Sequence, residues 1–208
     1  MEESSENEEI ANEEEVSMPP VEIVVVAHNP DDWFGEVLTS LAVQNYLNLK
    51  VTILSTGPIE PIQQIADEYL PASEVLEVNP NHGFGRNLNA VLARSEHPAF
   101  YLFCHHDVSL APDAVRLMVE ESLRSNAAII GPKIVNWDRP NELLDVGYNM
   151  DKLGYPIGRV EMGELDQEQY DSVSEVFVVS TTATLVRADL FLALGGFDEA
   201  MGMVGEDV

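Results

Sequence analysis

Short apolar runs alternate with amphipathic segments between residues 21 and 125. Runs rich in β-branched residues are typical of strands buried on both faces of a parallel sheet, while apolar residues three or four positions apart indicate helices. Strands alternating with helices at this spacing predict right-handed βαβ units and a mostly parallel sheet. The expected strands cover residues 21–27, 50–56, 73–78 and 99–104, and helices are expected from about residues 31, 61, 86 and 112.

Two of these helices carry signals for where they begin and which face they bury. Asp31 or Asp32 can cap the first helix, and Pro112 suits the first position of the fourth. The residues expected to face the core are Trp33, Val37, Leu38, Leu41 and Ala42 in the first helix and Val115, Met118 and Val119 in the fourth.

The pattern changes after residue 127, where helical spacing gives way to short strands and turns. Residues 127–135 and the longer run 176–187 have the composition of strands, and an acidic segment, 161–175, lies between them. A short helix is expected after residue 187. We therefore expect an α/β fold in which a mostly parallel sheet flanked by helices carries a mixed-sheet extension.

Composition narrows the class of protein. Of the 208 residues 45% are hydrophobic, yet no apolar run approaches the roughly 20 residues that a membrane-spanning helix needs. The amino terminus has neither the basic nor the apolar region of a signal peptide. Cys104 is the only cysteine, which excludes an intrachain disulfide and fits a reducing compartment. These features predict a cytoplasmic protein.

The formal net charge of -27 is distributed unevenly. Residues 1–20 hold eight Glu and neither Lys nor Arg, which predicts a disordered acidic arm. The remaining residues still contain 29 acidic and 10 basic side chains. Such a surface repels nucleic acids, so we expect no nucleic-acid partner.

The first candidate functional residues lie at the end of the fourth strand, where "FYLFCHHDVSL" places His105, His106 and Asp107 in a row. A central parallel strand opens at its carboxyl end onto the crevice in which α/β sheets bind ligands. Strand alternation directs His105 and Asp107 to one face and His106 to the other. The alternative is a polar loop that closes the strand and binds nothing.

Four other polar groups have both a functional and a structural explanation. His28 and Asn29 follow the first strand and either face the crevice or form a capped turn. The loop "NHGFGRNLN" places two glycines before a helix, as in a phosphate-binding turn or a plain strand-to-helix connection. The stretch "STTAT", 180–184, lines a pocket or faces solvent on alternate residues. Glu206 and Asp207 are a catalytic pair or a solvated acidic surface.

Taken in order, these motifs resemble the family 2 glycosyltransferases of the GT-A fold. The resemblance covers residues 21–208 and implies a catalytic domain with a nucleotide-sugar half at about 21–110 and an acceptor-side half at about 111–208. The segment "GELDQEQYD" is similar to actinobacterial members that build cell-envelope glycans. Because the chain stops just after the "ED" pair, we expect the domain to be incomplete at its carboxyl terminus. The motifs are "VVVAHNP", "NHGFGRNLNAVL", "LFCHHDVSLAPDAV", "GPKIV", "VFVVSTTATLVRADLFLALGGFDE" and "GEDV".

The resemblance assigns roles on the donor side. Asp107 matches the aspartate of the strand-end metal motif usually written DXD, and His105 replaces its first carboxylate. Because imidazole suits transition metals while Mg²⁺ prefers oxygen ligands, this pair favours Mn²⁺ over Mg²⁺. Many relatives have an aspartate where this chain has Ser55. The residues expected to bind the nucleotide-sugar are His28, Asn29, Ser55, Arg86, Asn89 and His105.

The resemblance also implies an inverting sugar transfer in which Asp207, with Glu206 beside it, acts as the general base. The expected donor is a UDP- or dTDP-sugar, and the expected acceptor is a glycan or a lipid-linked molecule. Any membrane association, at the inner face, would come through parts that this chain does not contain.

Two other functions compete with this interpretation. A non-catalytic nucleotide- or glycan-binding domain would keep the fold, and the substitutions at His105 and Ser55 favour it. A sugar-phosphate nucleotidyltransferase would need a glycine-rich, basic loop directly after the first strand, which "AHNPDDW" does not provide. Release of nucleoside diphosphate from a nucleotide-sugar separates the first interpretation from both.

Overall fold

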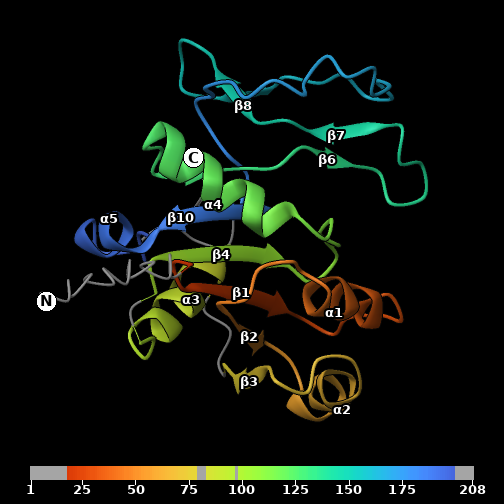
Figure 1. Cartoon of the computed structure of the whole chain (residues 1–208), viewed down its shortest axis with the longest axis vertical. Helices are drawn as coiled ribbons and strands as arrows, with labels where there is room; N and C mark the ends of the chain where they lie inside the picture. Colours follow the sequence, from red (N-terminus) through yellow and green to blue (C-terminus); the bar gives the residue numbers. More distant parts are fainter. Residues whose placement is uncertain (1–17, 79–82, 97, 200–208) are drawn as a thin grey trace, which may run out of the picture.

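The computed structural model describes residues 18–78, 83–96 and 98–199, which form a central sheet with helices on both faces (Figure 1). The sheet has six strands in the order β3-β2-β1-β4-β10-β5. The alternating half of the chain provides β1 (Val21–Ala27), α1 (Phe34–Ala42), β2 (Leu49–Ser55), α2 (Ile59–Tyr69), β3 (Glu74–Glu77), α3 (Phe84–Leu92), β4 (Phe100–His105) and α4 (Ala114–Ser125).

Strand β1 lies inside this sheet at the point where the strand order reverses. It pairs in parallel with β2 on one side and with β4 on the other, and β2 pairs in parallel with β3. The chain thus builds outward from β1 to β3 and then returns to place β4 on the other side of β1. In open α/β sheets, ligands bind at the carboxyl ends of the two strands that flank such a reversal.

The second half of the chain extends the sheet and adds smaller ones. β10 (Ala183–Arg187) pairs antiparallel with both β4 and β5 (Ile129–Ile130), and α5 (Ala188–Ala193) follows it directly. This arrangement confirms the expected α/β class with a mixed-sheet extension. In the part of the chain that the structure describes, no helix is long and apolar enough to cross a membrane.

Two two-stranded sheets form the extension that stands apart from the main sheet in Figure 1. Lys133 ties the acidic segment to it, because its Nζ lies 2.7 Å from Asp166 Oδ2 and 2.5 Å from Asp171 Oδ1. The hydrogen bonds with these carboxylates raise the pKa of Lys133, and the bond from Lys133 lowers the pKa of Asp166. The strands of the extension are β6 (Ile134–Val135), β7 (Leu143–Asp145), β8 (Tyr148–Met150) and β9 (Pro156–Gly158).

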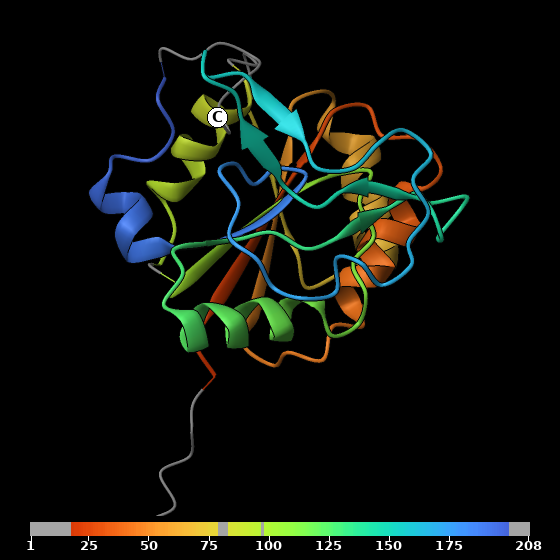
Figure 2. The same cartoon turned by 90° about the horizontal axis from the view of Figure 1, so that it is seen from above.

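The main sheet is buried on both faces. Because side chains alternate along a strand, each central strand contributes to two cores. Val25 and Leu102 pack with residues of α1, α2 and α4, whereas Val24 and Phe103 pack with residues of α3 and α5. Figure 2 shows these two groups of helices on opposite sides of the sheet. Polar groups needed for chemistry are therefore confined to the ends of the strands.

The predicted order of strands and helices from β1 to α4 is confirmed, with ends shifted by three residues or fewer. The predicted strand 176–187 is wrong in its first part, since only Ala183–Arg187 forms β10. Phe177 and Val178 pair with β8 instead: the Phe177 N–H donates to Tyr148 O at 3.0 Å, and the Tyr148 N–H donates to Val178 O at 3.0 Å. These backbone groups are satisfied in the extension rather than in the main sheet.

The first helix begins later than its sequence signals predicted. Trp33, not Asp31 or Asp32, occupies the N-cap, and no side chain makes a capping hydrogen bond. Trp33 and Ala42 are exposed, although they were expected to face the core. The buried stripe instead starts at Phe34 and continues through Val37, Leu38 and Leu41, which is the spacing of one helical face. Helix α4 begins at Ala114, two residues after Pro112, and buries Val115, Met118 and Val119 as expected.

The boundary of the predicted acidic arm also moves. Residues 1–17 lie outside the described residues, but the last three residues of the expected arm are bound to the domain. Pro20 O accepts the Ala99 N–H at 2.8 Å, Pro19 O accepts the Tyr46 hydroxyl at 2.6 Å, and Met18 O accepts Asn48 Nδ2 at 2.8 Å. The folded domain therefore begins no later than Met18.

We expect that starting the chain at Met18 will leave its melting temperature unchanged to within about a degree, because the deleted residues are mostly polar and acidic. Starting it at Val21, with the initiator methionine in the place of Pro20, should lower the melting temperature by several degrees. That deletion removes the acceptors of Asn48 and of the largely buried Tyr46, and each net hydrogen bond contributes about 1 kcal/mol. Equal melting temperatures of the two shortened chains would contradict the contacts described above.

The thiol of Cys104 should be unreactive in the folded protein. It is completely buried in β4, and burial, with a smaller contribution from the negative charge of Asp107, raises its pKa to about 12. Only the thiolate attacks a disulfide reagent. At pH 8 the fraction of Cys104 in the thiolate form is then roughly a thousandfold smaller than that of a free thiol. Labelling with a chromogenic disulfide in buffer and in denaturant checks this, and rapid stoichiometric labelling in buffer would contradict it.

Candidate functional site

Two groups of polar residues meet at the carboxyl edge of the sheet, where the strand order reverses. In the register of the sheet Val26 of β1 lies opposite His105 of β4, so His28 and Asp107 leave adjacent strands close to the same level. His106 Nδ1 lies 3.2 Å from Val26 O. Because a carbonyl oxygen can only accept, Nδ1 must carry the proton, and this hydrogen bond ties the end of β4 to β1.

The loop after β1 is tied to the end of β2. His28 Nδ1 lies 3.2 Å from Thr56 O and 3.1 Å from Thr56 Oγ1, and Asn29 Nδ2 lies 3.4 Å from His28 Nε2. Asn29 adopts a left-handed backbone with φ of 44°. A Cβ at Gly57 would come within 2.7 Å of Asn29 Oδ1, so a larger residue at position 57 would displace the Asn29 side chain. His28 and Asn29 are exposed, as a ligand would require.

Ser55, expected among the nucleotide-sugar-binding residues, is directed elsewhere. It is fully buried at the end of β2, and its hydroxyl donates to Gly57 O at 2.9 Å. Its side chain thus shapes the turn that holds Asn29 and is not accessible to a ligand in this structure.

His105 is the last residue of β4 and His106 is the first residue after it, and their side chains point in different directions. The ring of His105 lies 5.2 Å from the ring of Phe84 on the α3 face, and its backbone N–H donates to Thr182 O at 3.1 Å. His106 turns instead toward the backbone of β1. The strand ends at His105, so the alternation expected to continue to Asp107 stops before it. Asp107 is exposed in the turn that follows.

The stretch 180–184 lies beside this strand end. Its residue Thr182 accepts the His105 N–H, the hydroxyls of Ser180 and Thr182 are 2.7 Å apart, and Thr181 and Thr184 are buried. These threonines support the backbone next to β4 and do not form an exposed polar face. One alternative predicted that alternate residues of this stretch face solvent. Thr181 and Thr184 do not, because both are buried.

Within the described ranges, no three His, Cys, Asp or Glu side chains come together in a way that could hold a metal ion. The expected ligands Asp107 and His105 offer one exposed carboxylate and one half-buried imidazole. A divalent ion that binds a nucleotide is commonly held by one or two protein ligands and completes its coordination with phosphate oxygens and water. One carboxylate and one imidazole match that small number of protein ligands, and they are too few for a closed metal centre built from protein alone.

Helix α3 begins at the same edge and is joined to the segment after α5. Asn89 Oδ1 accepts the Phe197 N–H at 3.0 Å, and Asn89 Nδ2 donates to Phe197 O at 2.8 Å. Arg86 Nε lies 3.5 Å from Glu199 Oε2, and both side chains are largely exposed. Asn89 and Arg86, expected to bind the nucleotide-sugar, thus make protein contacts here. The role of Phe197 was not predicted from the sequence. The features that could have suggested it are an asparagine inside the third helix and the stretch "GGF" at residues 195–197.

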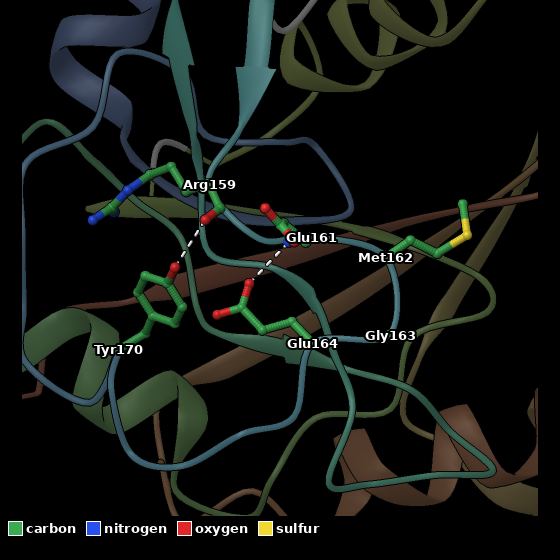
Figure 3. A pocket seen from close by; sticks show the side chains of 6 residues that line it. All are labelled: Arg159, Glu161, Met162, Gly163, Glu164 and Tyr170. Atoms are coloured by element: carbon green, nitrogen blue, oxygen red, sulfur yellow. Dashed lines mark hydrogen bonds between the residues drawn. The ribbon is translucent and has the colours of Figure 1, made fainter.

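Two shallow hollows lie outside the strand ends. One, of about 480 Å³, is lined by Asn89 and residues 194–199. The other, of about 470 Å³, lies in the extension (Figure 3). There the Tyr170 hydroxyl donates to Arg159 O at 2.8 Å, the guanidinium of Arg159 lies 5.6 Å from the Tyr170 ring centre, and the Glu161 N–H donates to Glu164 Oε2 at 2.9 Å. Its other lining residues are Met162 and Gly163.

The expected catalytic pair, Glu206 and Asp207, lies outside the described residues. The described chain ends at Glu199. The candidate site therefore consists of the strand ends of β1 and β4, the beginning of α3 and the turn that residues 195–199 form against it.

Several solved structures of glycosyltransferases have a fold similar to that of this chain. The mannosyltransferase PcManGT from Pyrobaculum calidifontis, solved with GDP-Man and Mn²⁺, matches with a TM-score of 0.63 and 14% identity over 92% of this chain and 50% of that chain. Residues 1–349 of S. aureus TarS, solved with UDP, match with a TM-score of 0.64 and 18% identity over 90% and 52% of the two chains. The same TarS fragment with UDP-GlcNAc matches with a TM-score of 0.58 and 18% identity over 86% and 48%.

At these identities the likeness concerns the fold, a GT-A-like α/β domain with a mostly parallel sheet flanked by helices. The chain spans about half the length of these solved structures. A comparison with curated protein sequences gave no match. The family model for glycosyl transferase family 2 matches residues 22–194. Since that range is most of the chain, the protein belongs to glycosyl transferase family 2.

Proposed function

We propose that this domain transfers a sugar from a nucleotide-sugar to a glycan or lipid-linked acceptor, with inversion at the sugar and with the help of a divalent metal ion. The observation that carries the proposal is that His28–Asn29 and His105–Asp107 lie at the neighbouring carboxyl ends of β1 and β4, at the strand-order reversal of a family 2 domain. Ligands bind at this position in open α/β sheets. The similar folds solved with GDP-Man, UDP and UDP-GlcNAc support a nucleotide-sugar as donor, and we propose a UDP- or dTDP-sugar.

The charge of the chain supports the need for a cation. A diphosphate is repelled by a protein with a formal net charge of -27 unless local positive charge holds it. Asp107, with His105 beside it, would bind the ion, and the imidazole favours Mn²⁺ over Mg²⁺. When bound, such an ion neutralises the negative charge of the departing diphosphate. The solved mannosyltransferase contains Mn²⁺, which is consistent with this choice.

The acceptor hydroxyl must lose its proton as it attacks the sugar. A carboxylate within hydrogen-bond distance is the usual base for such a step. We assign this role to Asp207, with Glu206 beside it, on the resemblance of the "GGFDE" and "ED" motifs to the family pattern. Because inversion proceeds by in-line displacement, the base lies on the side of the sugar opposite the diphosphate, and no covalent intermediate is required.

An assay of nucleoside diphosphate release tests the proposal directly. The full chain would be incubated with UDP-, dTDP- and GDP-sugars in the presence of Mn²⁺, Mg²⁺ or a chelator, with and without oligosaccharide acceptors. We expect release from one donor class with Mn²⁺ and its loss with the chelator. Binding of nucleotide without release under every condition would instead identify a non-catalytic binding domain.

We expect Asp107→Asn to weaken metal-dependent nucleotide binding by about 10- to 100-fold, because the amide removes the negative charge that holds the ion. Calorimetry with UDP at fixed Mn²⁺ measures this, and the melting temperature should hardly change because Asp107 is exposed. Asp113→Asn is the matched control, since Asp113 is a partly exposed aspartate just before α4 whose carboxylate lies 3.7 Å from Arg116. If Asp107→Asn binds Mn²⁺ and UDP as tightly as the parent does, Asp107 is not the metal ligand.

A further inference from the structure

We infer that the hydroxyls of Ser180 and Thr182 bind the sugar of the donor and contribute to the choice of that sugar. This inference rests on the proposed function, and it names the part of the site that meets the transferred group. The stretch 180–184 was expected to line a pocket or to face solvent, and none of its residues has a role in the metal binding or the base catalysis of the proposed transfer.

The start of β10 places this hydroxyl pair beside the candidate metal ligands. Because β10 runs antiparallel to β4, its first residues lie at the carboxyl end of β4, with Ala183 opposite Cys104. One residue earlier, Thr182 O accepts the His105 N–H at 3.1 Å. This hydrogen bond holds the backbone of Thr182 next to that of His105. The pair therefore stands at the same edge of the sheet as the residues proposed to bind the metal ion.

The two hydroxyls form a small unit with hydrogen-bonding capacity to spare. Ser180 Oγ lies 2.7 Å from Thr182 Oγ1, and the Thr182 N–H donates to Ser180 Oγ at 3.2 Å. A bond between two hydroxyls uses one of their two hydrogens, and among the described residues no acceptor receives the other. Both residues are half-buried and keep part of their surface open to solvent. The pair thus retains one donor for a ligand, with acceptor lone pairs beside it.

A sugar hydroxyl is the partner that this unit suits best. Such a hydroxyl both donates and accepts, as the Ser180–Thr182 pair does. A phosphate oxygen only accepts, and its strong hydrogen bonds come from positively charged donors, which the pair does not provide. With a formal net charge of -27, the protein repels an anion that has no cation beside it. The pair therefore suits the neutral sugar of the donor rather than its diphosphate.

The order of the strands gives the donor a direction across the site. β2, β1, β4 and β10 are neighbours in that order, each about 4.8 Å from the next (Figure 1). His28 after β1 is bonded to Thr56 after β2, whereas the proposed metal ligand Asp107 follows β4. The hydroxyl pair precedes β10, on the other side of Asp107 from His28.

The connectivity of a nucleotide-sugar matches this order. Its diphosphate joins the nucleoside to the sugar, so a metal-bound diphosphate at Asp107 has the nucleoside on one side and the sugar on the other. The exposed imidazole of His28 and the amide of Asn29 suit a nucleobase, which is planar and has hydrogen-bonding edges. The sugar then lies on the side of β10, where the hydroxyl pair stands.

A purely structural role of the pair makes a different prediction. Ser180 Oγ accepts the Thr182 N–H and Ser180 O accepts the Thr184 hydroxyl, so these contacts shape the entry into β10. A residue that only shapes this entry changes stability, or weakens the binding of every ligand alike. A residue that contacts the sugar weakens the binding of those ligands that carry the sugar. Comparing nucleoside diphosphates with nucleotide-sugars separates the two roles.

The experiment compares the parent with Thr182→Val and Ser180→Ala in the full chain. Valine keeps the branched shape of threonine and replaces only the hydroxyl. Thr184→Val is the matched control, because Thr184 lies two residues further along the same segment and its buried hydroxyl donates to Ser180 O. Each protein is titrated calorimetrically in Mn²⁺ with UDP, UDP-glucose, UDP-GlcNAc, dTDP, dTDP-glucose, GDP and GDP-mannose, and its melting temperature is recorded.

For the nucleotide-sugar that the parent binds best, we expect Thr182→Val to weaken binding by about five- to tenfold, the effect of one lost hydrogen bond. Affinity for the matching nucleoside diphosphate should stay within about twofold. Ser180→Ala should show the same selective loss, and Thr184→Val should show none. A monodeoxy analogue of that donor, lacking the contacted hydroxyl, should bind equally well to the parent and to Thr182→Val.

Equal weakening of the nucleoside diphosphate and the nucleotide-sugar would overturn the inference, because it would place the ribose or the diphosphate beside the pair. Unchanged affinity for both would overturn it as well, and so would a selective loss that Thr184→Val shares. If the parent binds no nucleotide in Mn²⁺, the proposed function fails and the inference fails with it. If the parent binds the donor and releases nucleoside diphosphate while Thr182→Val and Ser180→Ala behave as the parent does, only the inference fails.

Discussion

The pairing of β1 with both of its neighbours is the constraint on which the site depends. β1 is buried on both faces and hydrogen-bonded along both edges, so its interior has no room for an exposed polar group. The one acidic residue inside it, Glu22, is only 3% exposed, and the Thr52 hydroxyl donates to it at 2.8 Å. Since Ala27 lies opposite Ser55 and Val26 opposite His105, the carboxyl ends of three strands are level. Side chains that follow these ends are brought together by the sheet itself.

A cluster of aromatic rings joins the two sides of the candidate site. Phe84 lies between His105, at the end of β4, and Phe197, in the turn after α5, with ring centres 5.2 and 6.0 Å away. Phe103 and Phe191 pack under the same ring of Phe197. Close-packed rings transmit displacement because their neighbours leave little empty volume. The strand end proposed to hold the metal and the turn that leads to the proposed base are therefore parts of one packed unit.

Much of the fold from β1 to α4 could be predicted because its signals are local. Apolar runs and helical spacing determine β1 to β4 and α1 to α4, and the strand-end rule then brings His28 near His105. Three features could not be predicted, since they depend on contacts between distant segments. Phe177 and Val178 read as strand but pair with Tyr148, Ser55 follows an ordinary strand but is buried in a turn, and Asn89 pairs with Phe197. The periodic pattern of apolar and polar residues does not indicate which distant residues will contact each other.

The extension is stabilised by other interactions than the main sheet. Its strands are only two or three residues long, and an isolated two-stranded sheet is marginal in water. Polar links such as Lys133 with Asp166 and Asp171 hold it in place, and at 29% exposure the Lys133 side chain is partly open to solvent. In the proposed function the donor chemistry is fixed by the sheet, so the acceptor side can vary in sequence while the strand ends remain in place.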